Sequence, residues 1–173
     1  MIIKKASQVG EPVIRTRAKR VSDMQSKDVQ KTIKDLTDSM RHHGLVGMAA
    51  PQIGRGERIF VTEIRKTKSR TPDQLDPLRV FINPKIVERS KKEIKGWEGC
   101  GSVAATNLFG VVKRPYSVTV EAYDENGEKF SLKTSGLLAR VIQHETDHLN
   151  GTVFTDKADV KTFMSKESYL NKG

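Results

Sequence analysis

The chain has 173 residues, enough for one sizeable hydrophobic core and too few for two domains of ordinary size. Its 31 Lys and Arg residues outnumber 21 Asp and Glu residues, which gives a formal net charge of +10 at pH 7. From the length we predict a single domain over residues 1–173. No apolar stretch of the sequence approaches the length needed to cross a bilayer, so we expect no membrane-spanning helix.

The compartment can be predicted from the N-terminal residues and from the cysteine count. Basic residues interrupt the first twenty positions, so we expect no signal peptide there. The single cysteine, Cys100, excludes an intrachain disulfide. We expect a reducing compartment, either the cytoplasm or the interior of an organelle of bacterial origin.

The first predicted element is an amphipathic helix that begins after a capping residue, Ser26, and ends near Gly44. Apolar residues recur at spacings of four, three and four, which is the period of one helix face. These residues are Val29, Ile33, Leu36 and Met40. The pattern predicts a helix packed on the core and carries no chemistry by itself.

A run of small residues at positions 44–54 follows this helix and contains one amide side chain, Gln52. Glycine and alanine let a backbone approach a ligand closely, and a glutamine placed there can donate a hydrogen bond to an oxyanion. Gly44 alone also fits the ordinary end of a helix followed by a turn.

Strands are predicted between this helix and a second one near the C-terminus. Asn126-Gly127 is a strong hairpin signal, and the hydrophilic segment 65–77 reads as a surface loop. The predicted strands are 58–64, 79–82, 85–88, 116–123 and 128–133. Strands that do not alternate regularly with helices indicate an α+β fold, with antiparallel or mixed sheets around the second helix.

Cys100 lies in the sequence Glu-Gly-Cys-Gly-Ser at residues 98–102. A lone cysteine is usually a small buried apolar residue, but here glycines on both sides indicate a backbone forced close to something. A thiolate is a strong ligand for a borderline divalent metal ion. Glu98 is a competing donor two residues away, and the sequence leaves both open.

The second predicted helix covers residues 136–149, with Ser135 as a cap and Gly151 as a stop, and it carries the sequence His-Glu-Thr-Asp-His. His144 and His148 are four residues apart, so they lie on one helix face and can bind one metal ion. Glu145 lies beside the first histidine, where it can act as a general base toward water. A solvated polar face is the alternative, which the flanking apolar residues disfavour: Val141, Ile142 and Leu149.

Residues beyond about 156 contain only scattered apolar side chains. We expect this tail to form a short helix or to be mobile.

Three segments in this order resemble the peptide deformylase family. They read Gly-Met-Ala-Ala-Pro-Gln at 47–52, Glu-Gly-Cys-Gly-Ser at 98–102 and Gln-His-Glu-Thr-Asp-His-Leu at 143–149. Two smaller matches are Ile-Asn-Pro at 82–84 and Asp-Glu-Asn-Gly at 124–127. The resemblance runs from about Val13 to Phe154, and three ordered motifs are far more specific than any one of them.

The resemblance implies a metal-dependent amidohydrolase that removes the formyl group from N-formylmethionyl peptides of nascent chains and releases formate. Cys100, His144 and His148 would bind one divalent metal ion. Fe²⁺ is expected in cells, with Zn²⁺, Ni²⁺ or Co²⁺ able to replace it in vitro.

The family pattern also gives roles to the remaining motif residues. Glu145 would be the general base and acid, and Gln52 with the backbone N–H of Gly101 would form the oxyanion hole. Formamide hydrolysis needs such a base and such donors. We assign substrate binding to Val46, Gly47, Gly99, Leu138 and Val141.

The sequence departs from the family pattern at several places. Position 101 is usually leucine in the family, position 45 usually glycine and position 48 usually leucine, whereas this chain has Gly101, Leu45 and Met48. Segment 103–110 lacks the proline and arginine that many members carry. An alternative reading is therefore a deformylase-like protein that binds metal and formylated peptides with little turnover, and a general metallopeptidase is a weaker third.

The excess positive charge predicts a polyanionic partner. Basic residues gather at positions 15–20, 65–70 and 85–95, and the family acts on chains that emerge from the ribosome, whose surface is rich in RNA. Ribosomal RNA is thus expected as a docking surface, although a generally basic proteome explains the charge equally well. We expect a monomer, with no membrane partner and no sequence-specific nucleic acid.

Overall fold

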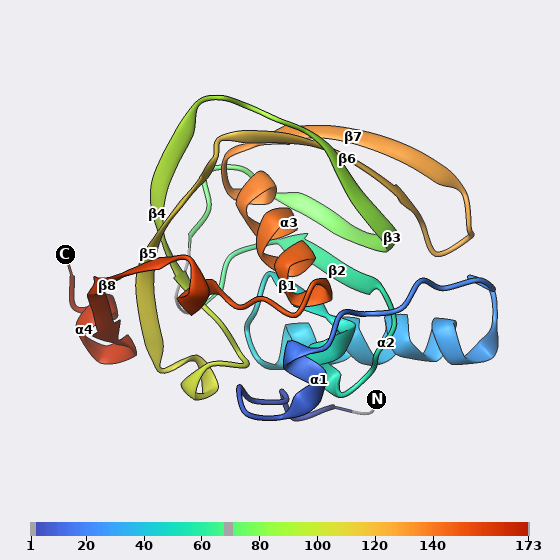
Figure 1. Cartoon of the computed structure of the whole chain (residues 1–173), viewed down its shortest axis with the longest axis horizontal. Coiled ribbons are helices and arrows are strands. Elements are labelled where there is room, and N and C mark those ends of the chain that lie inside the picture. The colour runs from blue at the N-terminus through green and yellow to red at the C-terminus, as the bar shows by residue number, and fades with distance from the viewer. Residues whose placement is uncertain (1–2, 68–70, 173) are drawn as a thin grey trace.

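A computed structural model describes residues 3–67 and 71–172 of the chain. Its strands form two sheets, and the helix α3 lies at the centre between them (Figure 1). The helices are α1 (Pro12–Arg15), α2 (Lys27–His42), α3 (Gly136–Leu149), α4 (Lys166–Leu170), and the short 3-10 turns η1 (Ala50–Ile53), η2 (Ala104–Thr106) and η3 (Phe154–Asp156). The strands are β1 (Gly47–Ala49), β2 (Ile59–Ile64), β3 (Asp76–Arg89), β4 (Glu93–Gly99), β5 (Leu108–Pro115), β6 (Ser117–Tyr123), β7 (Lys129–Ser135) and β8 (Ala158–Ser165).

The first sheet has five strands in the order β1-β2-β3-β6-β7, and the second has three in the order β4-β5-β8. All neighbouring strands are antiparallel. In Figure 1, α3 runs between β4 and β5 on one side and the larger sheet on the other. This arrangement confirms the predicted α+β class, with α3 at the centre.

The larger sheet has an apolar core on each face because side chains alternate along its strands. On β2, Ile59 and Val61 join the cluster that α2 covers, whereas Phe60 between them joins the cluster beneath α3. Phe60 stacks on Phe81 of β3 at 4.6 Å between ring centroids. The sheet therefore provides a packed base for α3.

Both long helices lie where the apolar periodicity predicts them. The Ser26 hydroxyl accepts a hydrogen bond from the Val29 backbone N–H and caps α2. Gly44 has φ +66°, which allows the chain to turn after this helix. The expected cap of α3 is wrong in one detail: Ser135 occupies the capping position, but its side chain makes no capping hydrogen bond.

The two strands predicted at 79–82 and 85–88 are parts of a single strand, β3. Asn83-Pro84 gives the break in the sequence pattern, and the structure accommodates it as a bulge in the pairing with β6. Asn83 has φ +53°, and its side chain bonds both the backbone N–H and the carbonyl of Val21 at 2.8 Å. These bonds hold the strand together across the irregularity.

The smaller sheet was not predicted. Strands β4 and β5 alternate weakly between apolar and polar residues, so their sequence gives little strand signal. The tail predicted to be helical or mobile forms a strand, β8, which pairs with β5, and only then the short helix α4. Of the predicted loop 65–77, residues 68–70 lie outside the described residues, and β3 already begins at Asp76.

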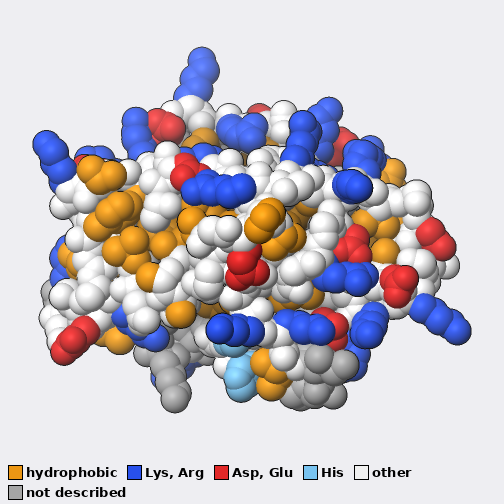
Figure 2. Space-filling model, turned by 60° about the horizontal axis from the view of Figure 1, so that its bottom comes forward, with side chains coloured by type: hydrophobic (Ala, Val, Ile, Leu, Met, Phe, Trp, Pro, Cys, Tyr) orange, Lys and Arg blue, Asp and Glu red, His pale blue; other side chains and the backbone are white. Residues whose placement is uncertain are grey.

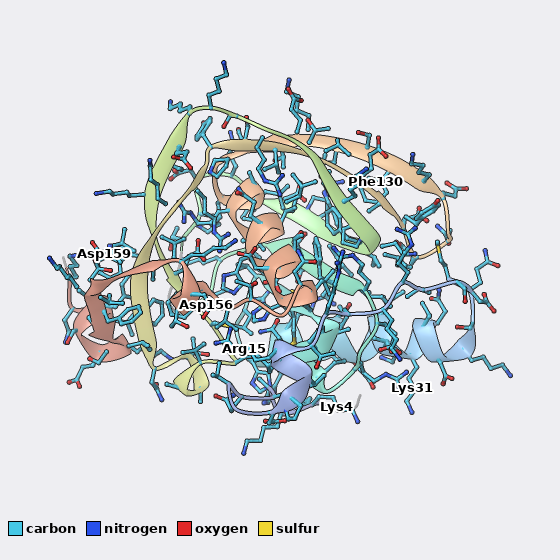
Figure 3. The ribbon with its side chains drawn as sticks, in the orientation of Figure 1. Lys4, Arg15, Lys31, Phe130, Asp156 and Asp159 are labelled. Atoms are coloured by element: carbon cyan, nitrogen blue, oxygen red, sulfur yellow. The ribbon has the colours of Figure 1, made fainter. Side chains whose placement is uncertain are left out.

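An ion pair joins the N-terminal segment to the residues that follow α3. The side chains of Arg15 on α1 and Asp156 on η3 point toward each other (Figure 3), with 2.5 Å between Arg15 Nη1 and Asp156 Oδ2.

Among the described residues, no helix is long and apolar enough to cross a membrane.

Candidate metal centre

Helix α3 places His144 and His148 on one face, one turn apart. Their ring centroids are 5.0 Å apart, and His148 is almost fully buried. The apolar residues Ile142 and Leu149 on other faces of the same helix pack against the larger sheet. Because the sheet fixes this rotation of α3, the two imidazoles face the smaller sheet.

Cys100 follows the end of β4 and meets both imidazoles. Its sulfur lies 3.1 Å from His148 Nε2, and one donor atom from each of Cys100, His144 and His148 lies within 4.8 Å of the others. The structure thus brings together all three residues that were predicted as metal ligands, and this group could hold a metal ion.

The surroundings of Cys100 favour its thiolate form. Burial alone would raise the pKa of this thiol, but the charge of His148 and hydrogen bonds with both imidazoles outweigh burial and hold the pKa well below its ordinary value. The Ser102 backbone N–H lies 3.4 Å from the sulfur. A thiolate is the form that binds a metal ion.

Glu98, the competing donor in the sequence, lies behind His144 and not in the group of three. Its Oε2 accepts a hydrogen bond from His144 Nδ1 at 2.9 Å, which leaves the other ring nitrogen of His144 for the metal group. Arg114 bonds both carboxylate oxygens at 2.6 and 2.8 Å, and Arg140 bonds one at 2.6 Å. Burial would raise the pKa of Glu98, but the hydrogen bonds from Arg114 and His144 and the charges of both groups hold the pKa well below its usual range.

Glu145 lies beside the metal group in a buried position. Burial raises its pKa to about 7, against the opposing charges of His144 and His148. Its Oε2 has no hydrogen-bond partner among the described residues. A Cβ atom at Gly47 would lie 2.5 Å from Glu145 Oε1, so only glycine lets β1 approach this carboxylate so closely.

The amide of Gln52 is fixed toward the metal group. Its Oε1 accepts a hydrogen bond from the Ala49 backbone N–H at 2.8 Å. Its Nε2 therefore points to the other side, 3.6 Å from the Cys100 sulfur and 3.4 Å from the Ser102 hydroxyl. This donor is in place for an oxygen atom that would bind beside the sulfur.

A cavity of about 90 Å³ opens beside these groups. It is lined by the metal-group residues Cys100 and His144 together with Glu145 and Gln52. Its other predicted lining residues are Val46, Gly47, Gly99, Gly101 and Val141.

Leu138 is the predicted substrate-binding residue that does not line this cavity. It packs beside the core of the larger sheet and lines a separate hollow with Ile64 and Tyr116. The physical reason is its height on α3, since it lies one turn closer to the helix N-terminus than Val141.

Five residues that line the cavity were not predicted from the sequence: Thr67, Trp97, Thr106, Phe109 and Arg140. Trp97 is two residues before Gly99 on β4, and the strand period of two would have placed both on one face. Phe109 could be found only through its pairing with Gly99. Arg140, four residues before His144, shares its helix face, which was a usable signal.

Two departures from the family pattern compensate each other in space. A Cβ atom at Gly101 would lie 3.3 Å from Leu45 Cδ1, so the Leu45 side chain occupies room that a side chain at position 101 would need. Met48, the third departure, is fully buried in the core beneath α2 and faces away from the cavity. The altered residues therefore leave the ligand group, the carboxylate and the amide intact.

The chain is similar to known proteins over most of its length. The family model described as polypeptide deformylase matches residues 3–163. The peptide deformylase of Natranaerobius thermophilus is 36% identical over 169 residues, covering 98% of this chain and 100% of that protein. The peptide deformylase of Microchaete diplosiphon is 38% identical over 163 residues, covering 94% of this chain and 83% of that protein.

Solved structures show the same similarity in three dimensions. A class I type b peptide deformylase from Acinetobacter baumannii, bound to Met-Ala-Ser, superposes with a TM-score of 0.84 at 30% identity, covering 91% of this chain and 100% of that one. The Thermotoga maritima enzyme gives 0.78 at 31% identity, covering 92% and 99%.

Fold, site and similarity together define a hydrolase with a role in protein biosynthesis. The chain belongs to the polypeptide deformylase family.

Proposed function

We propose that this chain hydrolyses the formyl amide of N-formylmethionyl peptides, a linear amide, and releases formate with the aid of one divalent metal ion. The observation that carries this proposal is the convergence of Cys100, His144 and His148 beside Glu145 and Gln52. One soft thiolate and two imidazoles suit a divalent transition metal. The buried and unpartnered Oε2 of Glu145, among the described residues, fits a site whose ligand includes a polar atom.

Cys100, His144 and His148 would hold the ion, and Glu98 would keep His144 oriented through its Nδ1. When bound, the ion supplies Lewis acidity, which activates water and polarises the formyl carbonyl. Fe²⁺ is the proposed ion in cells. Its thiolate ligand should make that form sensitive to oxygen.

Glu145 would act first as a base and then as an acid. Its carboxylate takes a proton from the attacking water and delivers it to the amine that leaves. Burial, which raises the pKa of this carboxyl group, favours its protonated form for the second of these steps. Gln52 Nε2 and the Gly101 backbone N–H would donate hydrogen bonds to the oxygen of the tetrahedral intermediate.

The first substrate side chain would lie against Val46, Gly47, Gly99 and Val141. The relative from Acinetobacter baumannii holds the peptide Met-Ala-Ser, which supports a methionine-led peptide as the ligand here.

Formate release from formyl-Met-Ala-Ser tests the proposal. Metal-loaded wild type should release formate, and Glu145→Ala should lower the rate at least about 100-fold while it keeps its metal. The matched control is Glu125→Ala, which removes an exposed carboxylate in the β6–β7 hairpin and should change nothing. Absence of formate release by wild type loaded with Fe²⁺, Ni²⁺, Co²⁺ or Zn²⁺ would refute the proposal.

Oxygen sensitivity tests the metal assignment. We expect the Fe²⁺ form to lose activity in air, while the Ni²⁺ and Co²⁺ forms keep it, because iron bound to a thiolate is readily oxidised. The measurement is formate release after timed exposure to air. Equal lifetimes of the Fe²⁺ and Ni²⁺ forms would contradict this assignment.

We further propose that the basic segment at 15–20 docks on ribosomal RNA, where nascent chains can reach the site. The protein would act there as a monomer in a reducing compartment. Arg17, Lys19 and Arg20 are exposed and have no carboxylate partner among the described residues. Burial lowers the pKa of nearby Arg58, and the charges of Arg17 and Arg20 lower it further, so these cations lie close together.

Co-sedimentation with ribosomes tests this docking. Arg17→Glu with Arg20→Glu should weaken binding at low salt, because phosphate contacts are electrostatic. The control pair Lys27→Glu with Lys31→Glu makes the same charge change on the exposed face of α2 and should bind as wild type. Equal loss in both pairs would show a general charge effect and contradict this location.

A further inference from the structure

The C-terminal segment reaches the rim of the cavity beside the metal group. Trp97 on β4 and Phe109 on β5 line that cavity, and Tyr169 on α4 lies against both rings. These three residues form what we call the aromatic shelf. In Figure 2, hydrophobic side chains gather on the side of the molecule where α4 and β8 lie in Figure 1.

The ring of Phe109 is held on two sides. Tyr169 stacks on it with 4.3 Å between the ring centroids and 5° between the planes. A Cβ atom at Gly99 would lie 2.7 Å from Phe109 Cε1, so the ring also lies close against the end of β4. Phe109 is 5% exposed and has little freedom to move away from the cavity.

The same segment covers Trp97. The Tyr169 ring centroid lies 5.8 Å from that of Trp97, and Lys172 Nζ lies 4.2 Å from the Trp97 centroid. Aromatic pairs and cation–π contacts of this kind stabilise a defined position of both rings. The last described residues of the chain therefore fix two rings that face the substrate cavity.

Strand pairing carries Tyr169 to this place. In β8, Ser165 pairs with Leu108 and Met164 pairs with Phe109. The Lys166 backbone N–H donates to the carbonyl of Asn107 at 3.0 Å. A helix as short as α4 is not stable alone, so its position depends on β5 and on the stacked rings.

We propose that Tyr169 is a positioning residue for substrate specificity: it holds Phe109 and Trp97 as a shelf that binds an apolar side chain of the peptide beyond its first residue. The proposal rests on the proposed function, because it concerns peptides at the same site. An apolar side chain would bury its surface against the two rings. A small or polar side chain at that position would gain little from the shelf.

The test compares two substrates that differ in one side chain, formyl-Met-Ala-Ser and formyl-Met-Leu-Ser. For wild type, we expect the KM of the leucine peptide to be about fivefold below that of the alanine peptide. Tyr169→Ala should remove this difference by raising the KM of the leucine peptide, with kcat unchanged for both. Tyr169→Phe should behave as wild type, because stacking does not need the hydroxyl group.

Leu170→Ala is the matched control, since Leu170 follows Tyr169 on α4 and is 50% exposed. It should leave both KM values unchanged. Equal KM values of the two peptides for wild type, or an equal change of both peptides in Tyr169→Ala, would overturn the proposal.

Fluorescence gives a second measurement that requires neither turnover nor a substitution in α4. Trp97 is the only tryptophan in the chain, so its emission reports on the shelf. In the metal-loaded Glu145→Ala variant, formyl-Met-Leu-Ser should change the emission at saturation more than formyl-Met-Ala-Ser does. Identical changes would overturn the shelf alone, whereas no formate release by wild type would refute the proposed function and this inference with it.

Discussion

At the scale of single residues, two departures from the family pattern, Leu45 and Gly101, occupy the same small volume beside the site. Leu45 fills room beside Gly101, and the backbone N–H of Gly101 remains in place whatever its side chain. In the proposed function, Cys100, His144, His148 and Glu145 have no such freedom, because each would contribute a particular atom. A departure from the family pattern therefore affects the site when it removes an atom that the site uses, whatever the number of departures.

The exchange between Leu45 and Gly101 predicts coupled substitutions. Gly101→Leu should lower the free energy of unfolding by about 1–3 kcal/mol, because the new side chain meets Leu45 Cδ1. Leu45→Ala should remove that conflict. The double variant should therefore lose about 1 kcal/mol less of its free energy of unfolding than the two single losses add up to. Urea unfolding measures all of these values.

A matched control for this cycle is Gly56→Leu, since a Cβ atom at Gly56 meets nothing within 4 Å. Its effect should add to that of Leu45→Ala without coupling. Strict additivity of the Gly101 and Leu45 changes would show that the two side chains do not share the space.

At the scale of elements, the sequence predicted what local periodicity determines. Helix α2 follows from its apolar spacing, and α3 with His144 and His148 follows from the four-residue interval. Strand β8 could not be predicted, because none of its residues is buried and its pairing with β5 defines it. The pairing of Arg114 with Glu98 could not be predicted either, because the two residues are 16 positions apart in the sequence and only the fold brings their side chains together.

The contact between α1 and η3 predicts a pH effect on stability. A hydrogen bond from Arg15 lowers the pKa of Asp156 below its ordinary value of 3.8, despite partial burial. Because the folded-state pKa is the lower one, this contribution is present above pH 3.8 and is lost as the pH falls below it.

Asp156→Asn should therefore lower the Tm at neutral pH, and its difference from wild type should shrink as the pH falls below about 4. Thermal unfolding between pH 3 and pH 7 measures this difference. Asp73→Asn, at an exposed position without an ion pair among the described residues, should have the Tm of wild type throughout. A pH-independent gap for Asp156→Asn would mean that its charge is not involved.

At the scale of the whole molecule, the metal group adds a further link between parts that hydrogen bonds and ion pairs already join, such as that of Arg140 on α3 with Glu98 on β4. Cys100 belongs to the end of the smaller sheet, and His144 and His148 belong to the helix that packs on the larger sheet. A shared ion would tie these parts together in the folded state alone. Binding to the folded state stabilises it by mass action.

Removal of the metal with a chelator should consequently lower the Tm of the whole chain, and added Ni²⁺ should restore it. Cys100→Ser should show a much smaller response to both treatments, because it lacks the thiolate. Thermal unfolding before and after dialysis measures the effect. An unchanged Tm in wild type would indicate that the ion does not bind between these parts.

The most direct test of the account is the X-ray absorption spectrum of the zinc-loaded protein at the metal edge. The geometry predicts one sulfur ligand at about 2.3 Å and two imidazole nitrogens at about 2.0 Å. The sulfur contribution should disappear in Cys100→Ser. A wild-type spectrum with nitrogen and oxygen ligands only would contradict the assignment of Cys100, His144 and His148 to one ion.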